Sequence, residues 1–281
     1  MSKGILYLVA TPIGNLSDLS PRAREVLSTV DFVAAEDTRV THKLFTALGL
    51  PPKPMISYYE HNRRQRSEEV LARLLSGESC ALVTDAGMPA VSDPGEDMVA
   101  LAATNGIEVL PVPGCCAAVC ALAVSGLPTG RWCYEGFLSV NKKARREHLE
   151  SLKDERRTMI FYEAPHKLRN TLDDLRSAFG DERHISLSRE MTKLHEETLR
   201  FTLGEAAAYF AENAPRGEFV LVLEGAPESF PQDEDSRMEA AVAEVQSRVA
   251  QGESVKDAVK AVSASAGVKK NALYQRVIDT E

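Results

Sequence analysis

Polar and ionisable residues follow directly after an apolar run in the first third of the chain. Residues 85–95 contain two aspartates, two glycines and two prolines, and they come after the apolar run 80–83. Glycine lets a backbone approach a ligand closely, and proline stiffens a loop. Because open α/β sheets bind ligands at the carboxyl ends of buried parallel strands, this pattern is typical of a binding loop. The same residue types are common in ordinary turns, so both interpretations stay open.

Ionisable groups also gather in residues 36–39, 58–66 and 189–196. The second of these segments combines aromatic rings and a carboxylate with three arginines, and the third has more ionisable groups than a simple connection needs. Side chains of these types bind charged ligands and take part in proton transfer. Surface exposure accounts for the same density of charge, so a functional role is a hypothesis at this point.

Cations are concentrated in residues 141–148, and two further arginines lie in residues 155–157. A basic segment of this kind can lie along the phosphate backbone of a nucleic acid. A solvated helix face is the usual alternative for a run of charges. The net charge of −8 argues against wholesale non-specific binding of nucleic acid, which favours a basic protein, but it leaves room for a local basic face.

The elements expected to position these segments alternate between short apolar strands and helices. In the first part, strands are expected at 4–10, 32–35, 55–57, 80–83 and 108–112, with helices at 20–29, 41–48 and 67–76 and one ending near 104. This alternation predicts an α/β fold with a right-handed parallel sheet. A second α/β unit is expected to have strands at 132–137, 158–162, 184–188, 197–202 and 219–224. Its looser alternation indicates that some of its strand pairs are antiparallel.

The end of the chain changes in composition. Residues 225–235 are typical of a linker, and three short helices are expected at 238–250, 255–264 and 269–278. Ser254 to Asp257 fits a variant capping box. The predicted domains are residues 1–113, 114–226 and 236–281. The terminal helical module either docks RNA or is a structural appendage.

The totals for the whole chain exclude several classes of protein. Hydrophobic residues make up 44% and charged residues 26% of the 281 residues, which is ordinary for a soluble protein, and no apolar run reaches the ~20 residues of a membrane span. We therefore expect no membrane association and a cytoplasmic location. The five cysteines lack zinc-ribbon spacing and suggest reduced thiols, so no metal site is predicted. Neither a dinucleotide-binding nor a phosphate-loop motif is present.

Nine short motifs occur in order along the chain: LYLVATPIGNLSDL (6–19), AEDTR (35–39), YEHN (59–62), DAGMPAVSDPG (85–95), PGCCAA (113–118), SGLP (125–128), YEGFL (134–138), FYEAPHKL (161–168) and REMTKLHE (189–196). In this combination the chain closely resembles the bacterial 16S rRNA (cytidine-2′-O)-methyltransferases of the ribosomal RNA small subunit methyltransferase I family, within the tetrapyrrole methylase superfamily. The segment VKKNALY (268–274) resembles the helical module at the end of that family.

The resemblance implies two α/β domains with S-adenosylmethionine in the cleft between them, usually in a homodimer that acts on the 16S rRNA of the small ribosomal subunit. By motif position, the residues implied to bind the donor are Pro12, Asp85, Ala86, Gly87, Ala90, Cys116, Ala117 and Tyr162. The chain departs from the family at Met88, where threonine is more frequent, and at Cys115, where proline is frequent. Both departures change side chains in the pocket wall.

Methyl transfer from a sulfonium to a ribose 2′-hydroxyl is an in-line displacement, in which the protein holds the reactants ~3–3.5 Å apart. The hydroxyl is a weak nucleophile, so a nearby base or a cation should help. Ionisable candidates in the loops expected to rim the cleft are Asp37, Arg39, Glu60, His61, Glu163, Glu190 and Lys193. We hypothesise that Glu163 or Glu190 accepts the proton and that Lys193 stabilises the developing charge. For each residue, an ion pair that orders a loop is the alternative.

Seven cations are candidates for contacts with RNA phosphates: Arg63, Arg64, Arg66, Lys142, Lys143, Arg145 and Arg146. Two rival functions remain. One is a methyltransferase acting on a tetrapyrrole or another small molecule, since a shared fold does not fix the substrate. The other is a non-catalytic RNA-binding assembly protein that keeps the pocket. The basic segments and the terminal module argue against the first rival, because a tetrapyrrole enzyme needs neither.

Overall fold

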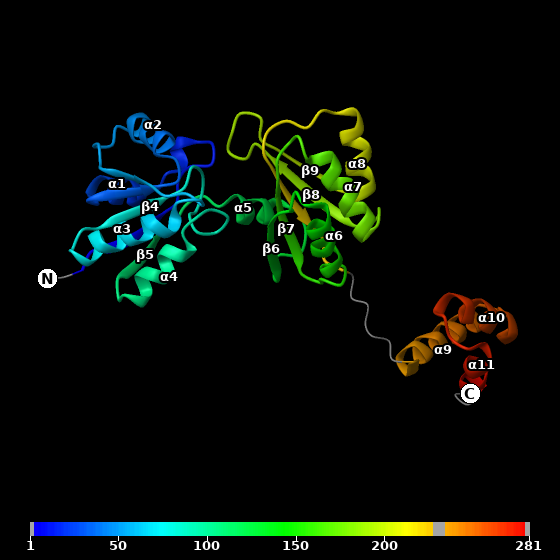
Figure 1. The fold of residues 1–281 in the computed structure, drawn as a ribbon. Helices are drawn as coiled ribbons and strands as arrows, with labels where there is room; N and C mark the ends of the chain where they lie inside the picture. The colour runs from blue at the N-terminus through cyan, green and yellow to red at the C-terminus, as the bar shows by residue number, and fades with distance from the viewer. Residues whose placement is uncertain (1–2, 227–233, 279–281) are drawn as a thin grey trace. The chain divides into compact units, whose positions relative to one another are not determined.

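The chain folds into two units. The computed structural model describes residues 3–226 and 234–278, and contacts between residues divide the chain into Met1–Gly225 and Ala226–Glu281. The first unit contains two five-stranded sheets with helices packed on them (Figure 1). One sheet is built from residues 5–112 and the other from residues 132–223. The expected α/β class is therefore confirmed, while the domain boundaries within the first unit stay a prediction.

All strands of the first sheet are parallel, in the order β3-β2-β4-β1-β5. Their bounds are β1 (Ile5–Val9), β2 (Phe32–Ala35), β3 (Met55–Ser57), β4 (Cys80–Val83) and β5 (Glu108–Val112). Strands β2 and β4 are buried at every position, because helices cover both faces of the sheet. The strand order places the carboxyl ends of β1 and β4 side by side, so the loops that follow these two strands meet.

Alternate residues of the first sheet pack against two pairs of helices. Phe32 and Leu82 join the core beneath α3 (Arg63–Leu75) and α4 (Glu96–Thr104), whereas Val33 and Val83 join the core beneath α1 (Pro21–Thr29) and α2 (Thr38–Leu48). A short 3-10 helix, η1 (Leu16–Asp18), lies between β1 and α1. Neighbouring side chains of a strand point to opposite faces of the sheet, and both faces of this sheet are covered by helices. The buried strands β2 and β4 therefore have apolar residues at consecutive positions.

Helix starts differ most from the sequence-based expectation. Helix α1 begins at Pro21 as expected, with the Ser20 side chain accepting a hydrogen bond from the backbone N–H of Ala23 (3.1 Å). Helix α3, expected from residue 67, already begins at Arg63. Its three arginines therefore lie on the first turns of a helix and not in a loop, which corrects the predicted boundary.

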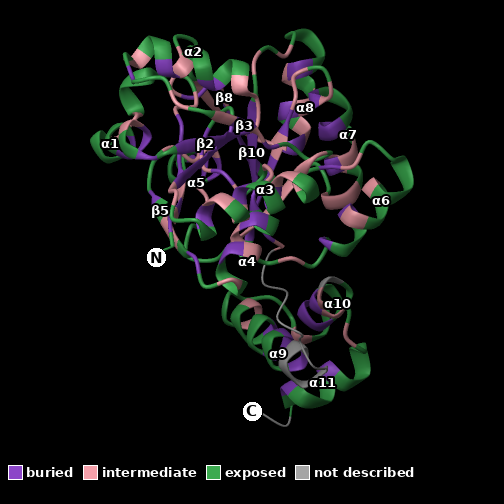
Figure 2. Cartoon of the chain, turned by 60° about the vertical axis from the view of Figure 1, so that its left-hand side comes forward, coloured by how far each residue is buried: buried purple, intermediate pink, exposed green. Residues whose placement is uncertain are grey.

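The second sheet is mixed, in the order β6-β7-β10-β8-β9. Its strands are β6 (Trp132–Phe137), β7 (Thr158–Glu163), β8 (His184–Arg189), β9 (Glu197–Thr202) and β10 (Phe219–Leu223). Only β6 and β7 are parallel, and β10 runs antiparallel to both β7 and β8. This confirms the expectation of antiparallel pairs. Figure 2 shows that buried residues concentrate in the strands, and β10 is buried at all five positions.

Helices also cover both faces of the second sheet. The apolar helix α5 (Ala117–Val124) packs on one face through Ala118, Ala121 and Leu122. The other face lies in the largest core cluster, which includes residues of α6 (Lys142–Ser151), α7 (Leu168–Phe179) and α8 (Leu203–Glu212). The side chain of Asn141 caps α6 by accepting hydrogen bonds from the N–H groups of Lys143 and Ala144. The basic segment predicted near 141–148 is thus the first part of a helix.

The second unit consists of three helices around their own core. They are α9 (Glu234–Ala250), α10 (Val255–Ala266) and α11 (Lys270–Ile278), and their core includes Val245, Val259 and Leu273. The predicted cap of α10 is confirmed, because Ser254 accepts a hydrogen bond from the N–H of Asp257. Part of the predicted linker, residues 227–233, lies outside the described residues, and residues 234 and 235 belong to α9. Within residues 3–226 and 234–278, no helix is both long and apolar enough to cross a membrane.

Candidate active site and nucleic-acid interface

The loops after β1 and β4 are joined to each other by backbone hydrogen bonds. The N–H of Thr11 donates to the carbonyl of Gly87 (2.9 Å), and the N–H of Gly87 donates to the carbonyl of Thr11 (3.1 Å). Gly87 adopts a φ of 90°, which residues with a side chain rarely adopt. The glycine predicted from the sequence is therefore needed for the backbone conformation that joins the two loops.

A cavity of about 320 Å³ opens beside this junction, and we call it the cleft cavity. Residues of the loops that follow β1 and β4 line it, together with the start of α5 and residues of the second sheet and its loops. They are Ile13, Ala86, Gly87, Met88, Val91, Ser92, Asp93, Cys116, Ala117, Phe137, Tyr162, Glu163, Ala164, Glu190, Met191, Lys193, Glu218, Phe219 and Val220. Apolar walls with a few convergent polar groups are typical of a site for a small molecule.

Two contacts connect the halves of the first unit around the cleft cavity. The backbone N–H of Asn15 donates to the hydroxyl of Thr192 (3.1 Å), and the hydroxyl of Tyr134 donates to that of Ser92 (2.9 Å). A Cβ atom at Gly14 would lie 2.5 Å from the Cγ of Lys193. The absence of a side chain at residue 14 therefore allows the loop after β1 to lie against the 189–197 loop of the second half.

Most of the predicted donor-binding residues lie at this cavity. Ala86, Gly87, Cys116, Ala117 and Tyr162 line it, whereas Pro12, Asp85 and Ala90 are not among its lining residues. Their predicted contacts with a donor stay predictions. The carboxylate of Asp85 accepts a hydrogen bond from the N–H of Asp37 (3.2 Å), and burial together with the nearby charge of Glu36 raises its pKa.

Tyr162 connects β7 to the start of α5. Its hydroxyl accepts a hydrogen bond from the backbone N–H of Ala118 (3.0 Å), and burial raises its pKa. Its ring makes edge contacts with Tyr134 (centroids 5.3 Å apart) and Phe137 (5.6 Å). These contacts hold the tyrosine ring in one orientation at the cavity wall.

The three residues predicted to act in catalysis, Glu163, Glu190 and Lys193, all line the cleft cavity. Glu163 is 4% exposed. One of its oxygens accepts a hydrogen bond from the N–H of Ala164 (2.8 Å), and the other accepts one from the hydroxyl of Thr171. Thr171 in turn accepts a hydrogen bond from Nη2 of Arg145 (2.8 Å). The carboxylate therefore has a fixed position, stabilised by an indirect link to a guanidinium group.

Glu190 and Lys193 form an ion pair with a further carboxylate beside them. Nζ of Lys193 lies 3.0 Å from Oε1 of Glu190 and 3.2 Å from Oε2 of Glu218. The hydrogen bond from Lys193 lowers the pKa of Glu190. Burial by itself would lower the pKa of Lys193, but the hydrogen bonds to the two glutamates outweigh this effect and raise it. The lysine is thus held as a cation at the cavity wall.

Asp93 lines the cleft cavity but was not among the site residues predicted from the sequence. Burial, followed by the charge of nearby Glu36, raises its pKa from 3.8 to about 6. Glu36 itself accepts a hydrogen bond from the hydroxyl of Thr84 (2.5 Å). Asp93 belongs to the binding-loop pattern, but no local pattern indicates that the carboxylates of Glu36 and Asp85 lie close to it.

The remaining four ionisable candidates do not line the cleft cavity. Arg39 binds the carboxylate of Asp37 (2.6 Å), and this hydrogen-bonded pair lowers the pKa of Asp37 to about 2. Glu60 pairs with Arg63 (3.2 Å), and the ring of His61 lies edge-on to that of Tyr59. The structure therefore gives these side chains partners close to them in the sequence, at the start of α2 for Asp37 and Arg39 and just before or at the start of α3 for Glu60 and His61.

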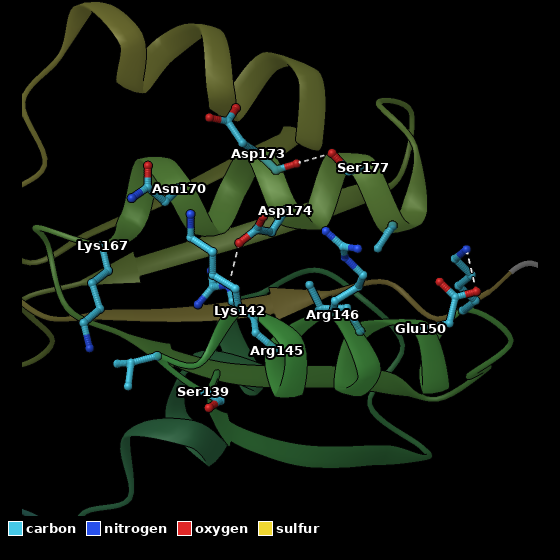
Figure 3. Close-up of a pocket in the computed structure, with 14 residues that line it drawn as sticks. Ser139, Lys142, Arg145, Arg146, Glu150, Lys167, Asn170, Asp173, Asp174 and Ser177 are labelled. Carbon is cyan, nitrogen blue, oxygen red and sulfur yellow. Dashed lines mark hydrogen bonds and ion pairs between the residues drawn. The ribbon is translucent and has the colours of Figure 1, made fainter.

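A second hollow lies between α6 and α7 and encloses about 760 Å³; we call it the basic groove (Figure 3). Its lining residues are Ser139, Val140, Lys142, Arg145, Arg146, Leu149, Glu150, Lys153, Lys167, Asn170, Asp173, Asp174, Ser177 and Ala178. Three of the seven predicted phosphate contacts, Lys142, Arg145 and Arg146, are among them. The structure thus brings these cations to one surface together with two further lysines.

The predicted phosphate contacts differ in their protein partners. Arg145 has a side chain that is 13% exposed, and its Nε donates to the carboxylate of Asp174. Lys143 lies 3.8 Å from Glu147 on an exposed helix face. Arg63 pairs with Asp97 (3.1 Å), and Arg66 pairs with Glu69. Arg145 is therefore a structural residue in this conformation, and its predicted contact with RNA stays a prediction.

Neither a disulfide nor a metal cluster contributes to the site. All five cysteines are free thiols, and Cys116 lines the cleft cavity. Among residues 3–226 and 234–278, no group of three or more histidine, cysteine, aspartate or glutamate side chains could hold a metal ion.

The chain is similar to a known family over most of its length. The model of the tetrapyrrole (corrin/porphyrin) methylases matches residues 5–207. Two proteins named ribosomal RNA small subunit methyltransferase I are close relatives. The one from Synechocystis sp. is 47% identical over 279 residues, covering 99% of both chains, and the one from Escherichia coli O157:H7 is 42% identical, covering 100% of this chain and 96% of its own.

Solved structures are similar in fold at much lower identity. Uroporphyrin-III-C-methyltransferase from Thermus thermophilus is 20% identical, with a TM-score of 0.56 over 78% of this chain and 94% of its own. The methyltransferase CobJ is 19% identical, with a TM-score of 0.58 over 79% of this chain and 95% of its own. These likenesses agree with the two-sheet architecture of the first unit.

Proposed function

The chain belongs to the tetrapyrrole methylase family and, within it, to the ribosomal RNA small subunit methyltransferase I proteins, and from this premise we propose that it methylates the 2′-oxygen of a cytidine ribose in the decoding region of bacterial 16S rRNA. The methyl donor of this family is S-adenosylmethionine. The single observation that carries the proposal is the near-full-length similarity to proteins of that name. The cleft cavity and the basic groove supply a physical rationale.

The cleft cavity suits a donor that is both apolar and positively charged. Ile13, Met191 and Val220 provide apolar walls, and four carboxylates face one lysine among the lining residues. A volume of about 320 Å³ lies at the lower end of the ~300–1,000 Å³ of small-molecule sites. We propose that Ala86, Gly87, Cys116, Ala117 and Tyr162 bind the donor at the cavity wall and that Pro12, Asp85 and Ala90 contact it as well.

The residues of the chain act mainly by holding the methyl donor and the ribose in the orientation that the reaction requires. The bound donor supplies a methyl group that its sulfonium has already activated. The joined loops at Thr11 and Gly87, together with the fixed ring of Tyr162, provide rigid walls against which a ribose is oriented and water is excluded. Orientation of this kind accounts for a large part of the rate of a displacement reaction.

Proton transfer from the ribose hydroxyl is the step for which side chains of the cavity have suitable chemistry. We propose that Glu163 or Glu190 accepts this proton and that Lys193 stabilises the developing charge on the oxygen. Lys193 already stabilises the negative charge of Glu190 and lowers its pKa, which weakens Glu190 as a base. The fixed carboxylate of Glu163 does not share that ion pair, which favours Glu163.

The basic groove is the proposed contact surface for RNA phosphates. Lys142, Arg146, Lys153 and Lys167 add positive charge to its walls, which is what a phosphate backbone requires. We propose further contacts at Lys143, Arg145, Arg63, Arg64 and Arg66. A tetrapyrrole substrate would have no use for such a groove. We also propose a homodimer in the cytoplasm, which light scattering and cell fractionation would test.

Transfer of tritium from labelled S-adenosylmethionine tests the proposal. The substrate is small ribosomal subunits from cells that lack the gene, followed by mass spectrometry of the rRNA nucleosides. The expected product is a 2′-O-methylcytidine that is missing from the untreated subunits. Label in a base or at another ribose would refute the cytidine assignment. Donor binding without any transfer to RNA would favour a silent RNA-binding protein, and transfer only to a tetrapyrrole would favour the small-molecule rival.

A further inference from the structure

Phe137 is a large apolar residue that is exposed at the site. It lines the cleft cavity and is 60% exposed, which makes it the most exposed of the described phenylalanine, tyrosine and tryptophan residues. Single exposed apolar residues are normal on protein surfaces. An exposed ring at the edge of a ligand cavity is different, because it offers an unoccupied stacking surface next to the place where a substrate must enter.

A β-bulge directs this ring toward the cavity. In the pairing of β6 with β7, Tyr134 lies opposite Ile160. The next residue of β7, Phe161, lies opposite Gly136 and not opposite residue 135, so β6 has one extra residue at this point. As a result, Phe137 lies opposite Tyr162. Without that insertion, Tyr134 and Phe137 would point to opposite faces, since side chains alternate along a strand. Bulges redirect side chains in this way next to active sites. The φ of 66° at Gly136 explains why glycine is at this position.

The ring of Phe137 rests on a rigid support. Its centroid lies 5.6 Å from that of Tyr162, with an interplanar angle of 66°. Tyr162 is itself held by the N–H of Ala118 and by the ring of Tyr134. A ring that is already fixed loses little conformational freedom when a ligand stacks on it, so it is a good recognition surface.

Phe137 is also close in sequence to residues that line the basic groove. Ser139 and Val140, two and three residues later, line the basic groove, and Val140 is 80% exposed. The segment from residue 137 to residue 140 therefore leads from the cleft cavity to the basic groove. An RNA strand whose phosphates lie in the groove would reach the cavity by passing this segment.

We propose that the base of the target nucleotide stacks on the ring of Phe137 while its ribose enters the cleft cavity. Proteins that recognise unpaired RNA commonly stack bases on aromatic side chains. This inference rests on the proposed RNA methyltransferase function and adds the residue that holds the base. Phe137 is thus assigned as a positioning residue for the nucleotide, separate from the carboxylates that act on the hydroxyl.

Three variants test the assignment: Phe137→Ala removes the ring, Phe137→Trp keeps an aromatic surface, and Trp132→Ala removes an exposed ring from the start of the same strand. The substrate is small ribosomal subunits from cells that lack the gene. The measurements are the KM for subunits, the dissociation constant of S-adenosylmethionine by calorimetry, and the salt dependence of subunit binding. Thermal melting checks that each variant is folded.

Phe137→Ala should raise the KM for subunits roughly 10- to 100-fold, the range expected from loss of one base–aromatic stack. The slope of log affinity against log salt should not change, because a stack releases no counterions. Phe137→Trp should restore the KM, and Trp132→Ala should leave it unaltered. A merely structural role would not produce rescue by tryptophan together with an unchanged salt slope.

The outcomes separate the two proposals. If the wild-type protein transfers no methyl group to RNA, the proposed function fails and the stacking assignment fails with it. If the wild-type protein methylates RNA but Phe137→Ala retains the normal KM, the stacking assignment alone is refuted. It is also refuted if tryptophan gives no rescue, or if the only effect of the alanine variant is weaker donor binding.

Discussion

The cleft cavity and the basic groove are two hollows with opposite charge, the first lined by both halves of the first unit and the second by the half that carries α6 and α7. Four carboxylates and one lysine line the cavity, whereas two arginines and three lysines line the groove together with three acidic residues. The cavity, at about 320 Å³, is smaller than the groove, which has about 760 Å³ and lies between α6 and α7 (Figure 3). Such a difference is suited to a small cation in one hollow and a polyanion in the other.

The two hollows nevertheless share one hydrogen-bonded connection. Glu163 at the cavity accepts a hydrogen bond from Thr171 of α7, which accepts one from Arg145 at the groove. Helix α7 thus contributes to both. Charge thus separates the proposed functions of the two hollows, while packing joins them. Variants of each hollow test whether one function can be changed without the other.

The largest effect is expected from Lys193→Ala in the cleft cavity. Loss of the ammonium group leaves Glu190 and Glu218 without their shared cation and removes the proposed stabilisation of the reacting oxygen. We expect the rate of methyl transfer to fall about 100-fold. Single-turnover transfer to small subunits, with donor affinity measured separately, checks this. A normal rate with normal donor affinity would rule out a catalytic role, and Lys43→Ala on exposed α2 is the matched control.

The second-largest effect is expected on RNA affinity, from substitutions in the basic groove. Replacing Lys142 and Arg146 together by alanine removes two proposed phosphate contacts. The slope of log affinity for RNA against log salt should become shallower by about 1.4, since each contact contributes about 0.7 for a single strand. Donor affinity should stay normal. Filter binding between 50 and 200 mM salt, roughly the range in which such contacts are lost, measures the slope.

Removal of two cations elsewhere is the control for that experiment. Arg22 and Lys43 are exposed on α1 and α2, outside the groove. Their joint replacement by alanine changes the net charge equally but should leave the slope as in the wild type. An identical loss of affinity in both double variants would mean that total charge, and not the groove, attracts RNA.

A smaller effect, which depends on pH, is expected from Asp93→Asn. The pKa of about 6 in the folded protein is above the 3.8 of an ordinary aspartate, so the native state holds an extra proton between these values. The free energy of unfolding should therefore fall as the pH rises from about 4 to about 6. In contrast, ionised Asp93 favours a cationic ligand, so donor affinity should rise severalfold from pH 5 to pH 7.5.

Calorimetry and thermal melting across this pH range test both trends for Asp93. The Asp93→Asn variant should lose the pH dependence that the aspartate contributes to donor affinity and to unfolding. A variant with the wild-type pH profile would show that another carboxylate, such as Glu36 or Asp85, titrates in its place.

The smallest effect is expected from Asn141→Ala at the start of α6. Its side chain caps the helix that carries Lys142 and Arg146, and loss of such a cap costs about 1 kcal/mol of stability. RNA affinity should fall slightly while donor affinity stays normal. Urea denaturation and filter binding measure the two. Ser20→Ala, which removes the cap of α1, should lower stability similarly without any change in RNA affinity.

Local patterns in the sequence predicted much of this architecture. The buried strand at 80–83 and the Ser20–Pro21 helix start are confirmed, because an apolar run and a capping residue act through near neighbours. The start of α3 was wrong by four residues, since the arginines at 63, 64 and 66 suggested a polar loop although arginine is a good helix former.

Long-range contacts explain what the sequence did not reveal. The period-2 pattern of β6 gives no sign of the bulge at Gly136, so the role of Phe137 was missed. The pKa of Asp93 is raised by burial and then by the charge of Glu36, which is distant in sequence. The partners of Arg145 depend on how α6 packs on α7. Each of these features requires knowledge of which elements become neighbours.

The loop after β8 holds Glu190 and Thr192 with φ angles of 51° and 64°, a left-handed conformation that is unfavourable for a threonine by about 1 kcal/mol or more. The hydroxyl of Thr192 accepts the hydrogen bond from Asn15 that bridges the two halves. A strained turn of this kind persists only where the surrounding contacts hold it, so the conformation of the loop after β8 and the hydrogen bond from Asn15 depend on each other.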